Sequence, residues 1–197
     1  MSTQRYTGLA TTLIDYMNEF LVVCPKCRKS ATVTYNHRQG QLDCSHCHHT
    51  EKSEDLVRYD VLLKRSCDTC GKLIEKKIPN NKEEVTEITI PCPHCGTTRT
   101  YKPRNERHVL YYRSDGKTDP AFNLSLWFQC DIRGHLFWAY NRAHLNEIEK
   151  YVAADLRERS RWTRMTMVER MPKFVKEAKN RDLLLRAIAK LLRKEEE

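Results

Sequence analysis

Between residues 24 and 95 the chain contains four Cys-x-x-Cys pairs: Cys24-Pro25-Lys26-Cys27, Cys44-Ser45-His46-Cys47, Cys67-Asp68-Thr69-Cys70 and Cys92-Pro93-His94-Cys95. Two thiolates separated by two residues reach one ion from a single tight turn, and two such turns supply the tetrahedral sulfur shell that Zn²⁺ prefers. The pattern therefore predicts two structural zinc ions. A four-thiolate shell is closed, so it leaves no position for water or substrate.

A disulfide framework is the alternative use of eight paired cysteines, and it requires an oxidising compartment and usually a secretory signal. Residues 1–10 hold no cationic segment followed by an apolar run, and Asp15, Asn18 and Glu19 interrupt the apolar residues that follow. No segment has the length of uninterrupted apolar sequence needed to cross a bilayer. We therefore expect a cytoplasmic protein, not bound to a membrane, whose thiols are reduced and hold metal.

The segments between the pairs favour two sequential zinc sites over one interleaved arrangement. Over residues 31–43, a β-rich run, a glycine-containing turn and a short return predict one hairpin between the first two pairs. Over residues 72–90, two β-rich runs around a polar loop predict a second hairpin between the last two pairs. An internal repeat with a period of about 45 residues describes both modules.

The pairs in Cys67-Asp68-Thr69-Cys70-Gly71 and Cys92-Pro93-His94-Cys95-Gly96 resemble the knuckles of the zinc-ribbon superfamily, which occurs in general transcription factors, RNA polymerase subunits and, with iron, rubredoxins. The trailing glycine allows the left-handed turn that directs backbone N–H groups at sulfur. The first two pairs continue instead with Arg28 and His48, which departs from this pattern. The resemblance covers about residues 22–102 and implies a fold; zinc ribbons bind DNA, RNA and protein alike.

Other candidate ligands surround these pairs. His46, His48 and His49 flank the second pair, but eight cysteines already fill two four-ligand shells, so we assign the histidines to a solvated turn. Iron is the alternative metal, because thiolate shells accept both ions. The ninth cysteine, Cys130, is expected to be a small buried hydrophobe without a functional role.

Charge separates the two halves of the chain, whose formal net charge is +9. Residues 1–100 contain 14 Lys and Arg against 12 Asp and Glu, and residues 101–197 contain 21 against 14. Each Zn²⁺ bound by four thiolates adds about −2, so the first half becomes about −2 and the whole chain about +5. Nucleic acid held by bulk electrostatics would therefore contact the C-terminal half.

The predicted fold class is α+β: two tandem zinc-ribbon β-hairpin modules, then an aromatic-rich β-hairpin and C-terminal helices. We expect an N-terminal amphipathic helix at 1–21, the first zinc ribbon at 22–58, the second at 59–102, and a hairpin plus basic helical domain at 103–197. The N-terminal helix rests on apolar residues at helical spacing, among them Phe20.

The segment 124–140 is the most apolar part of the chain and predicts a hairpin with Trp127 and Trp138 on adjoining strands. One use for these rings is to stack on bases, although large aromatics on paired strands more often form a core. Apolar residues at three- and four-residue spacing then predict a helix over 142–159, capped by Asn141.

A second helix is predicted from Asn180, and Pro172 interrupts the chain between the two helices. This joining stretch, 157–181, is rich in Lys and Arg. Arginines neutralise phosphate and an aromatic ring stacks on an unpaired base, although a solvated helical face with glutamate partners is an equally ordinary use. The residues assigned to a nucleic-acid surface are Arg157, Arg159, Arg161, Trp162, Arg164 and Lys173.

No Gly-rich phosphate loop, His-Glu-x-x-His helix or serine elbow occurs in the sequence, so we do not expect an enzyme. The predicted function is DNA or RNA binding by a non-catalytic zinc-ribbon protein, with a protein–protein adaptor as the alternative. Trp138-Ala139-Tyr140-Asn141, Leu145, Met171-Pro172-Lys173 and Lys179-Asn180-Arg181-Asp182 resemble bacterial proteins described only as zinc-ribbon-containing. That resemblance implies a bacterial setting and adds no catalytic residue.

Overall fold

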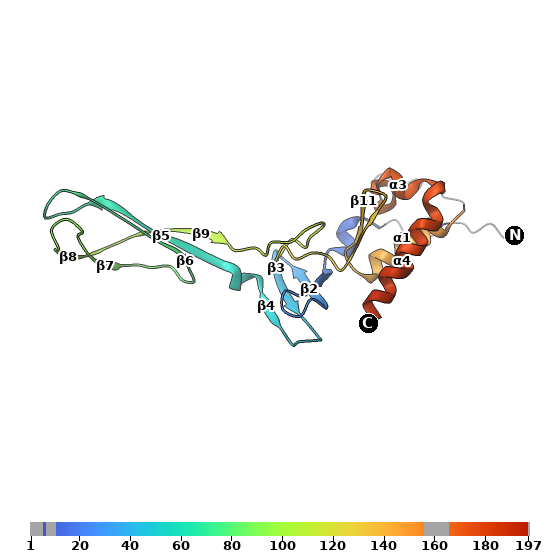
Figure 1. Ribbon diagram of the computed structural model, residues 1–197, viewed down its shortest axis with the longest axis horizontal. Coiled ribbons are helices and arrows are strands. Elements are labelled where there is room, and N and C mark those ends of the chain that lie inside the picture. Colours follow the sequence, from blue (N-terminus) through green and yellow to red (C-terminus); the bar gives the residue numbers. More distant parts are fainter. Residues whose placement is uncertain (1–5, 7–10, 156–165, 197) are drawn as a thin grey trace. The chain divides into compact units, whose positions relative to one another are not determined.

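A computed structural model describes residue 6, residues 11–155 and residues 166–196. The chain forms two compact units: unit 1 comprises Met1–Ser53 and Tyr112–Glu197, and unit 2 comprises Glu54–Tyr111 (Figure 1). Most of the segment expected to form the first zinc ribbon, residues 22–53, thus shares a unit with residues 112–197, so the four consecutive segments expected from the sequence do not follow this division. No described helix is long and apolar enough to span a membrane.

Unit 1 contains a four-stranded antiparallel sheet in the order β1-β2-β3-β4. Its strands are β1 (Glu19–Val23), β2 (Ser30–Asn36), β3 (Gln39–Asp43) and β4 (Thr50–Lys52). The hairpin predicted between the first two cysteine pairs is confirmed as β2 and β3. Buried residues alternate along the strands, as expected when one face packs on a core: Phe20, Val22, Ala31, Val33 and Leu42.

The N-terminal helix predicted for 1–21 is corrected by this strand. Among the described residues of this segment, only the 3-10 helix η1 (Leu13–Tyr16) is helical, and Phe20 lies on β1. The two-residue spacing that buries Phe20 and Val22 belongs to a strand and overrides the helical periodicity. Residues 1–5 and 7–10 lie outside the described part of the chain.

Strand β1 joins the first zinc segment to the C-terminal half. On one edge it pairs with β2, and on the other its backbone bonds to residues about 100 positions later. The Val23 N–H donates to the Ser125 carbonyl at 2.9 Å, and the Trp127 N–H donates to the Leu21 carbonyl at 2.8 Å. The Leu21 N–H donates to the Tyr140 carbonyl at 2.7 Å. These bonds explain why this segment folds with unit 1.

The predicted aromatic hairpin is confirmed as β10 (Phe128–Ile132) paired with β11 (His135–Ala139). Asn141 caps helix α1 (Arg142–Ala153), its Oδ1 accepting the His144 N–H at 2.9 Å. The helix ends at Ala153 and not at residue 159, because Ala154 is extended. Residues 156–165 lie outside the described residues.

Shorter elements follow, namely α2 (Met167–Arg170), α3 (Lys173–Lys176) and η3 (Ala178–Asn180). The second long helix, α4 (Arg181–Glu196), begins directly after Asn180, as predicted. Pro172 separates α2 from α3. The shared core of the hairpin and helices contains Phe128, Phe137, Leu145, Ile148, Val152, Met167, Leu184 and Ile188.

The two tryptophans of the hairpin segment differ in environment. Trp127 is 6 % exposed, lies in the core and has the Lys194 Nζ 3.8 Å above its ring centroid. Trp138 is half-buried, with the Lys117 Nζ 5.0 Å above its ring. The core interpretation is therefore confirmed for Trp127.

Unit 2 pairs its strands differently from the prediction. The three-stranded sheet has the order β6-β5-β9, formed by β5 (Val57–Ser66), β6 (Leu73–Asn81) and β9 (Arg104–Val109). A separate two-stranded antiparallel sheet pairs β7 (Ile88–Pro91) with β8 (Thr98–Tyr101). The hairpin predicted within residues 72–90 is wrong, because each knuckle in this unit joins two strands that pair with each other across it.

A buried histidine makes unit 1 sensitive to acid. His144 is 2 % exposed, its ring stacks on Tyr16 at 4.9 Å, and its Nδ1 accepts the Tyr140 N–H at 3.2 Å. Burial lowers the pKa of His144 from 6.5 to about 4. The unfolded chain therefore takes up the proton first, so this stabilisation is present above pH 6.5 and is lost as the pH falls toward about 4.

We expect unit 1 to lose roughly 3 kcal/mol of stability over that interval from this group alone. His144→Gln retains an acceptor but does not titrate, so its stability should vary less with pH. Chemical denaturation followed by helical circular dichroism, at pH of about 7 and about 5 with zinc in excess, measures both slopes. Equal slopes for the two proteins would contradict the prediction.

Candidate metal centres

The first metal centre is formed by Cys24 and Cys27, which flank the turn between β1 and β2, and by Cys44 and Cys47, which flank the turn between β3 and β4. All four sulfur atoms lie within 4.8 Å of one another. The Cys24 and Cys47 Sγ atoms are 3.7 Å apart, and those of Cys27 and Cys44 are 3.6 Å apart. A tetrahedron with Zn–S bonds of about 2.3 Å has edges of about 3.8 Å. The group can therefore hold one zinc ion.

The second centre repeats this arrangement in unit 2. Cys67 and Cys70 lie between β5 and β6, and Cys92 and Cys95 lie between β7 and β8. The Sγ separations are 3.8 Å for both Cys67–Cys95 and Cys70–Cys92. The eight predicted cysteines thus assemble as two sequential four-thiol groups, which supports two zinc-binding modules.

All four knuckles adopt one backbone turn. In each, the N–H of the residue after the second cysteine donates to the first cysteine's carbonyl, at 2.9–3.1 Å. That residue has a left-handed conformation in every case, with φ of 64° at Arg28, 55° at His48, 70° at Gly71 and 75° at Gly96. Arg28 and His48 therefore adopt the same turn as the two glycines, at a cost of about 1–2 kcal/mol each relative to glycine.

Backbone N–H groups favour the thiolate form that metal binding requires. The Lys26 N–H donates to the Cys24 Sγ at 3.4 Å, and the Thr69 N–H donates to the Cys67 Sγ at 3.4 Å. Hydrogen bonds from the Thr97 hydroxyl and N–H lower the pKa of Cys95 to about 6. These hydrogen bonds favour the thiolate form of Cys95.

Backbone N–H groups act in the same direction in the first group. Burial opposes the ionisation of Cys44, but the N–H groups of Cys47 and His46 outweigh it and lower the pKa of Cys44 to about 7. A polar network extends outward from this centre: the Tyr112 hydroxyl donates to the Glu51 Oε2 at 2.7 Å, and the His49 Nε2 lies 3.7 Å from the same oxygen. The pKa of Tyr112 is raised mainly by burial and, to a smaller extent, by this hydrogen bond to Glu51.

None of the three histidines around the second pair belongs to a four-ligand group among the described residues. His46 and His48 are exposed, while His49 is turned toward Glu51. The structure therefore supports the assignment of these imidazoles outside the metal shell.

The second centre forms much of the core of unit 2. Cys67 and Cys92 are 2 % exposed and pack with Leu63, Ile74 and Tyr101. The Arg65 guanidinium lies 4.9 Å above the Tyr101 ring. Sequence reasoning did not predict this tyrosine, whose only signal was an aromatic residue closing the last strand of the module. A core of this size depends on its metal for stability.

The remaining predicted site residues lie apart from both centres. Cys130 is half-buried on β10, and burial raises the pKa of its thiol, as expected for a small hydrophobe. Lys173 is the exposed first residue of α3. Five assigned nucleic-acid-binding residues lie outside the described part of the chain: Arg157, Arg159, Arg161, Trp162 and Arg164.

Comparison with protein-family models, curated proteins and solved structures finds no match for this chain. The two four-cysteine groups consequently carry the functional argument by themselves. They indicate structural zinc in each unit, and the choice of partner must come from the charge and exposure of the surrounding surface.

We expect the purified protein to contain two zinc ions per chain, and Cys130→Ser to retain both, because eight paired thiols complete two shells without it. Elemental analysis of protein expressed without added metal measures the ratio. A ratio of one, or loss of an ion in the Cys130 variant, would contradict the ligand assignment.

Proposed function

We propose that this protein is a non-catalytic, zinc-stabilised nucleic-acid-binding protein whose contact surface lies in unit 1. The observation that carries the proposal is the division of charge. Unit 1 holds 24 Lys and Arg against 17 Asp and Glu, whereas unit 2 holds 11 against 9. With about −2 for each zinc thiolate centre, unit 1 carries about +5 and unit 2 about zero. Excess positive charge supports binding to a phosphate backbone.

Ion pairing within unit 2 supports its assignment as a scaffold. Lys64 bonds to Glu75 at 2.6 Å across β5 and β6, and Lys77 bonds to Asp60 at 2.6 Å across the same strands. A lysine that is already paired with a carboxylate is less available to bind a phosphate. This sheet face is therefore electrostatically balanced.

Helix α4 in unit 1 differs in this respect. Arg186, Lys190 and Arg193 are exposed and recur at four- and three-residue spacing, so they share one face of the helix. None of them forms an ion pair with another described residue. Such a row supports contact with successive phosphates.

The closed thiolate shells support a structural and not a catalytic use of zinc. A reducing compartment such as the bacterial cytoplasm, which we propose as the setting, keeps these thiols available to the metal. An adaptor that binds another protein is the second candidate. Leu73, 49 % exposed beside the second zinc centre, favours that candidate in unit 2.

Charge reversal at Arg161 and Arg164 tests the proposed function. We expect weaker binding to all nucleic-acid sequences and a salt slope reduced by about one unit for each lost phosphate contact. Trp162→Ala should cost roughly 1–3 kcal/mol on single strands and less on duplex if the ring stacks on bases. Electrophoretic binding over a salt series measures all three variants.

Charge reversal at Lys72 and Lys76, both exposed in unit 2, is the matched control and should leave binding unchanged. A partner protein that copurifies after nuclease treatment, together with no binding to oligonucleotides, would establish the adaptor instead.

A further inference from the structure

The two zinc modules share their knuckle backbone but differ in the side chains it displays. Each knuckle places two residues outside the sulfur shell, one before and one after its second cysteine. In the second module these are Thr69, Gly71, His94 and Gly96. In the first module they are Lys26, Arg28, His46 and His48. At these positions the first module therefore displays a lysine and an arginine, and the second module displays neither.

Two of these side chains lie at positions with a left-handed backbone conformation, which glycine adopts most readily. Arg28 and His48 have φ of 64° and 55°, and the equivalent Gly71 and Gly96 have φ of 70° and 75°. Glycine is the unstrained residue in this conformation, so the turn itself does not require arginine or histidine. The presence of these two side chains is therefore not explained by the turn, and it is their position beside the metal centre that distinguishes them.

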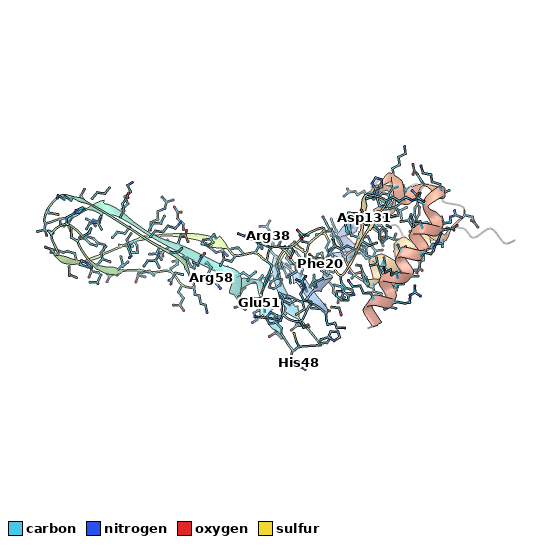
Figure 2. The ribbon with its side chains drawn as sticks, viewed as in Figure 1. Phe20, Arg38, His48, Glu51, Arg58 and Asp131 are labelled. Atoms are coloured by element: carbon cyan, nitrogen blue, oxygen red, sulfur yellow. The ribbon has the colours of Figure 1, made fainter. Side chains whose placement is uncertain are left out.

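The four side chains project from one end of the sheet. The two knuckles face each other across sulfur atoms that lie within 4.8 Å, while the turn at Arg38 joins β2 and β3 at the opposite end. Figure 2 shows His48 and Arg38 at these opposite ends. Lys26 and Arg28 are exposed and form no ion pair with any described residue.

An open hollow of about 600 Å³ lies beside the second knuckle and is lined by polar and apolar side chains, with Lys26 and Arg28 outside its lining. Hydroxyl and imidazole groups dominate its polar lining, which includes Ser30, Thr32, Ser45, His46, His48 and Thr50. One carboxylate, Asp43, also lines the hollow, and its Oδ1 accepts the Gln41 Nε2 at 3.3 Å. The volume is in the range of sites that hold a small ligand or one unit of a larger one.

We infer that the paired knuckles of the first zinc centre form a phosphodiester-binding surface, in which Lys26 and Arg28 contact the nucleic-acid backbone and the hollow receives an adjoining sugar-phosphate. Arginine forms forked hydrogen bonds with phosphate oxygens, and lysine supplies a mobile point charge. Hydroxyl and imidazole groups are further donors to phosphate and sugar. This inference rests on the proposed function and adds a contact surface to it.

The competing use of these cations is electrostatic: they can offset the charge of about −2 on the zinc thiolate centre. That use predicts a change in metal retention when they are removed, whereas a phosphate-binding use predicts a change in nucleic-acid affinity with the metal retained. The second module, which holds its thiolates with Thr69 and Gly71 at these positions, provides the residues for the test.

The experiment uses the full-length, zinc-loaded double variant Lys26→Thr/Arg28→Gly, which places the second module's residues on the first. We expect affinity for DNA and RNA oligonucleotides alike to fall about tenfold, and the salt slope to fall by about two units. Zinc content should remain two per chain, and the thermal midpoint should be unchanged or higher, because glycine relieves the left-handed turn. Similar losses on DNA and RNA are expected because both present phosphodiesters.

Two controls match this variant. Arg38→Gly removes a cation from the same backbone conformation, φ 66°, at the other end of β2 and β3. Lys72→Thr/Lys76→Thr removes two exposed cations from unit 2. Both controls should bind as the unaltered protein does.

The outcomes separate this inference from the proposed function. Normal affinity and slope in the Lys26/Arg28 variant, with binding by the unaltered protein, would overturn the knuckle surface alone. Loss of a zinc ion in that variant would also overturn it, in favour of the electrostatic role. If the unaltered protein binds no oligonucleotide, both the inference and the proposed function fail.

Discussion

Cys92→Ser is expected to unfold unit 2 while the helices of unit 1 persist. Cys92 is buried in a small core with Leu63, Cys67, Ile74 and Tyr101, so its removal breaks the metal shell and the packing together. Structural zinc contributes roughly 10–16 kcal/mol of apparent binding free energy in small domains, far more than such a core supplies. Loss of hydrogen-exchange protection in β5 to β9, with the helical circular dichroism retained, would show this result.

Cys24→Ser is the matched variant for the first centre and should behave differently. Cys24 follows β1, whose far edge bonds to residues 125–127 and whose Phe20 and Val22 are fully buried. Loss of this centre should therefore reduce helical circular dichroism as well. If Cys92→Ser abolishes the helical signal, or Cys24→Ser leaves it intact, the division into two independently stabilised units is wrong.

Asp119→Ala is expected to destabilise unit 1 by on the order of 4 kcal/mol, because it leaves three buried backbone N–H groups without an acceptor. Asp119 is 2 % exposed. Its Oδ1 accepts the N–H groups of Ala121 and Phe122, each at 2.8 Å, and its Oδ2 accepts the Leu124 N–H at 2.7 Å. Urea denaturation followed by helical circular dichroism measures the loss.

The loop that Asp119 organises is part of the core contact. Phe122 is fully buried. A Cβ atom at Gly40 would overlap the side chain of Ala121, so the loop packs directly on the start of β3. Burial raises the pKa of Asp119 even though the three N–H groups act to lower it. Asp119→Asn keeps one carbonyl acceptor in place and should lose less stability than Asp119→Ala. Equal losses in the two variants would show that the hydrogen bonds are not responsible.

The predictions that the structure confirms rest on short-range patterns. The β2–β3 hairpin follows from alternation around a tight turn, and the start of α1 follows from Asn141 directly before an apolar helical repeat. In each case the interacting groups lie within a few residues, so spacing along the chain determines the geometry.

The pairing of β5 with β6 and of β7 with β8 could not be read from the same spacing. Residues 72–90 alternate well enough to form a local hairpin. In the structure, β6 pairs instead with the preceding strand, and Leu63 and Ile74 are buried in one core with Cys67 and Cys92. Burial around the metal centre, which joins residues far apart in sequence, therefore accompanies the observed pairing.

The two sets of four cysteines and their sequential assignment follow from the sequence, because each tight turn supplies half of a tetrahedral thiolate shell and the short segments between the pairs favour neighbouring turns as partners. The tertiary structure alone decided that the first centre belongs to the C-terminal core and that Arg28 and His48 keep a glycine-type turn. The place of the first centre depends on hydrogen bonds between β1 and residues about 100 positions later in the chain. The turn at Arg28 and His48 depends on a left-handed backbone conformation that these residue types disfavour. Local periodicity in the sequence predicts neither feature.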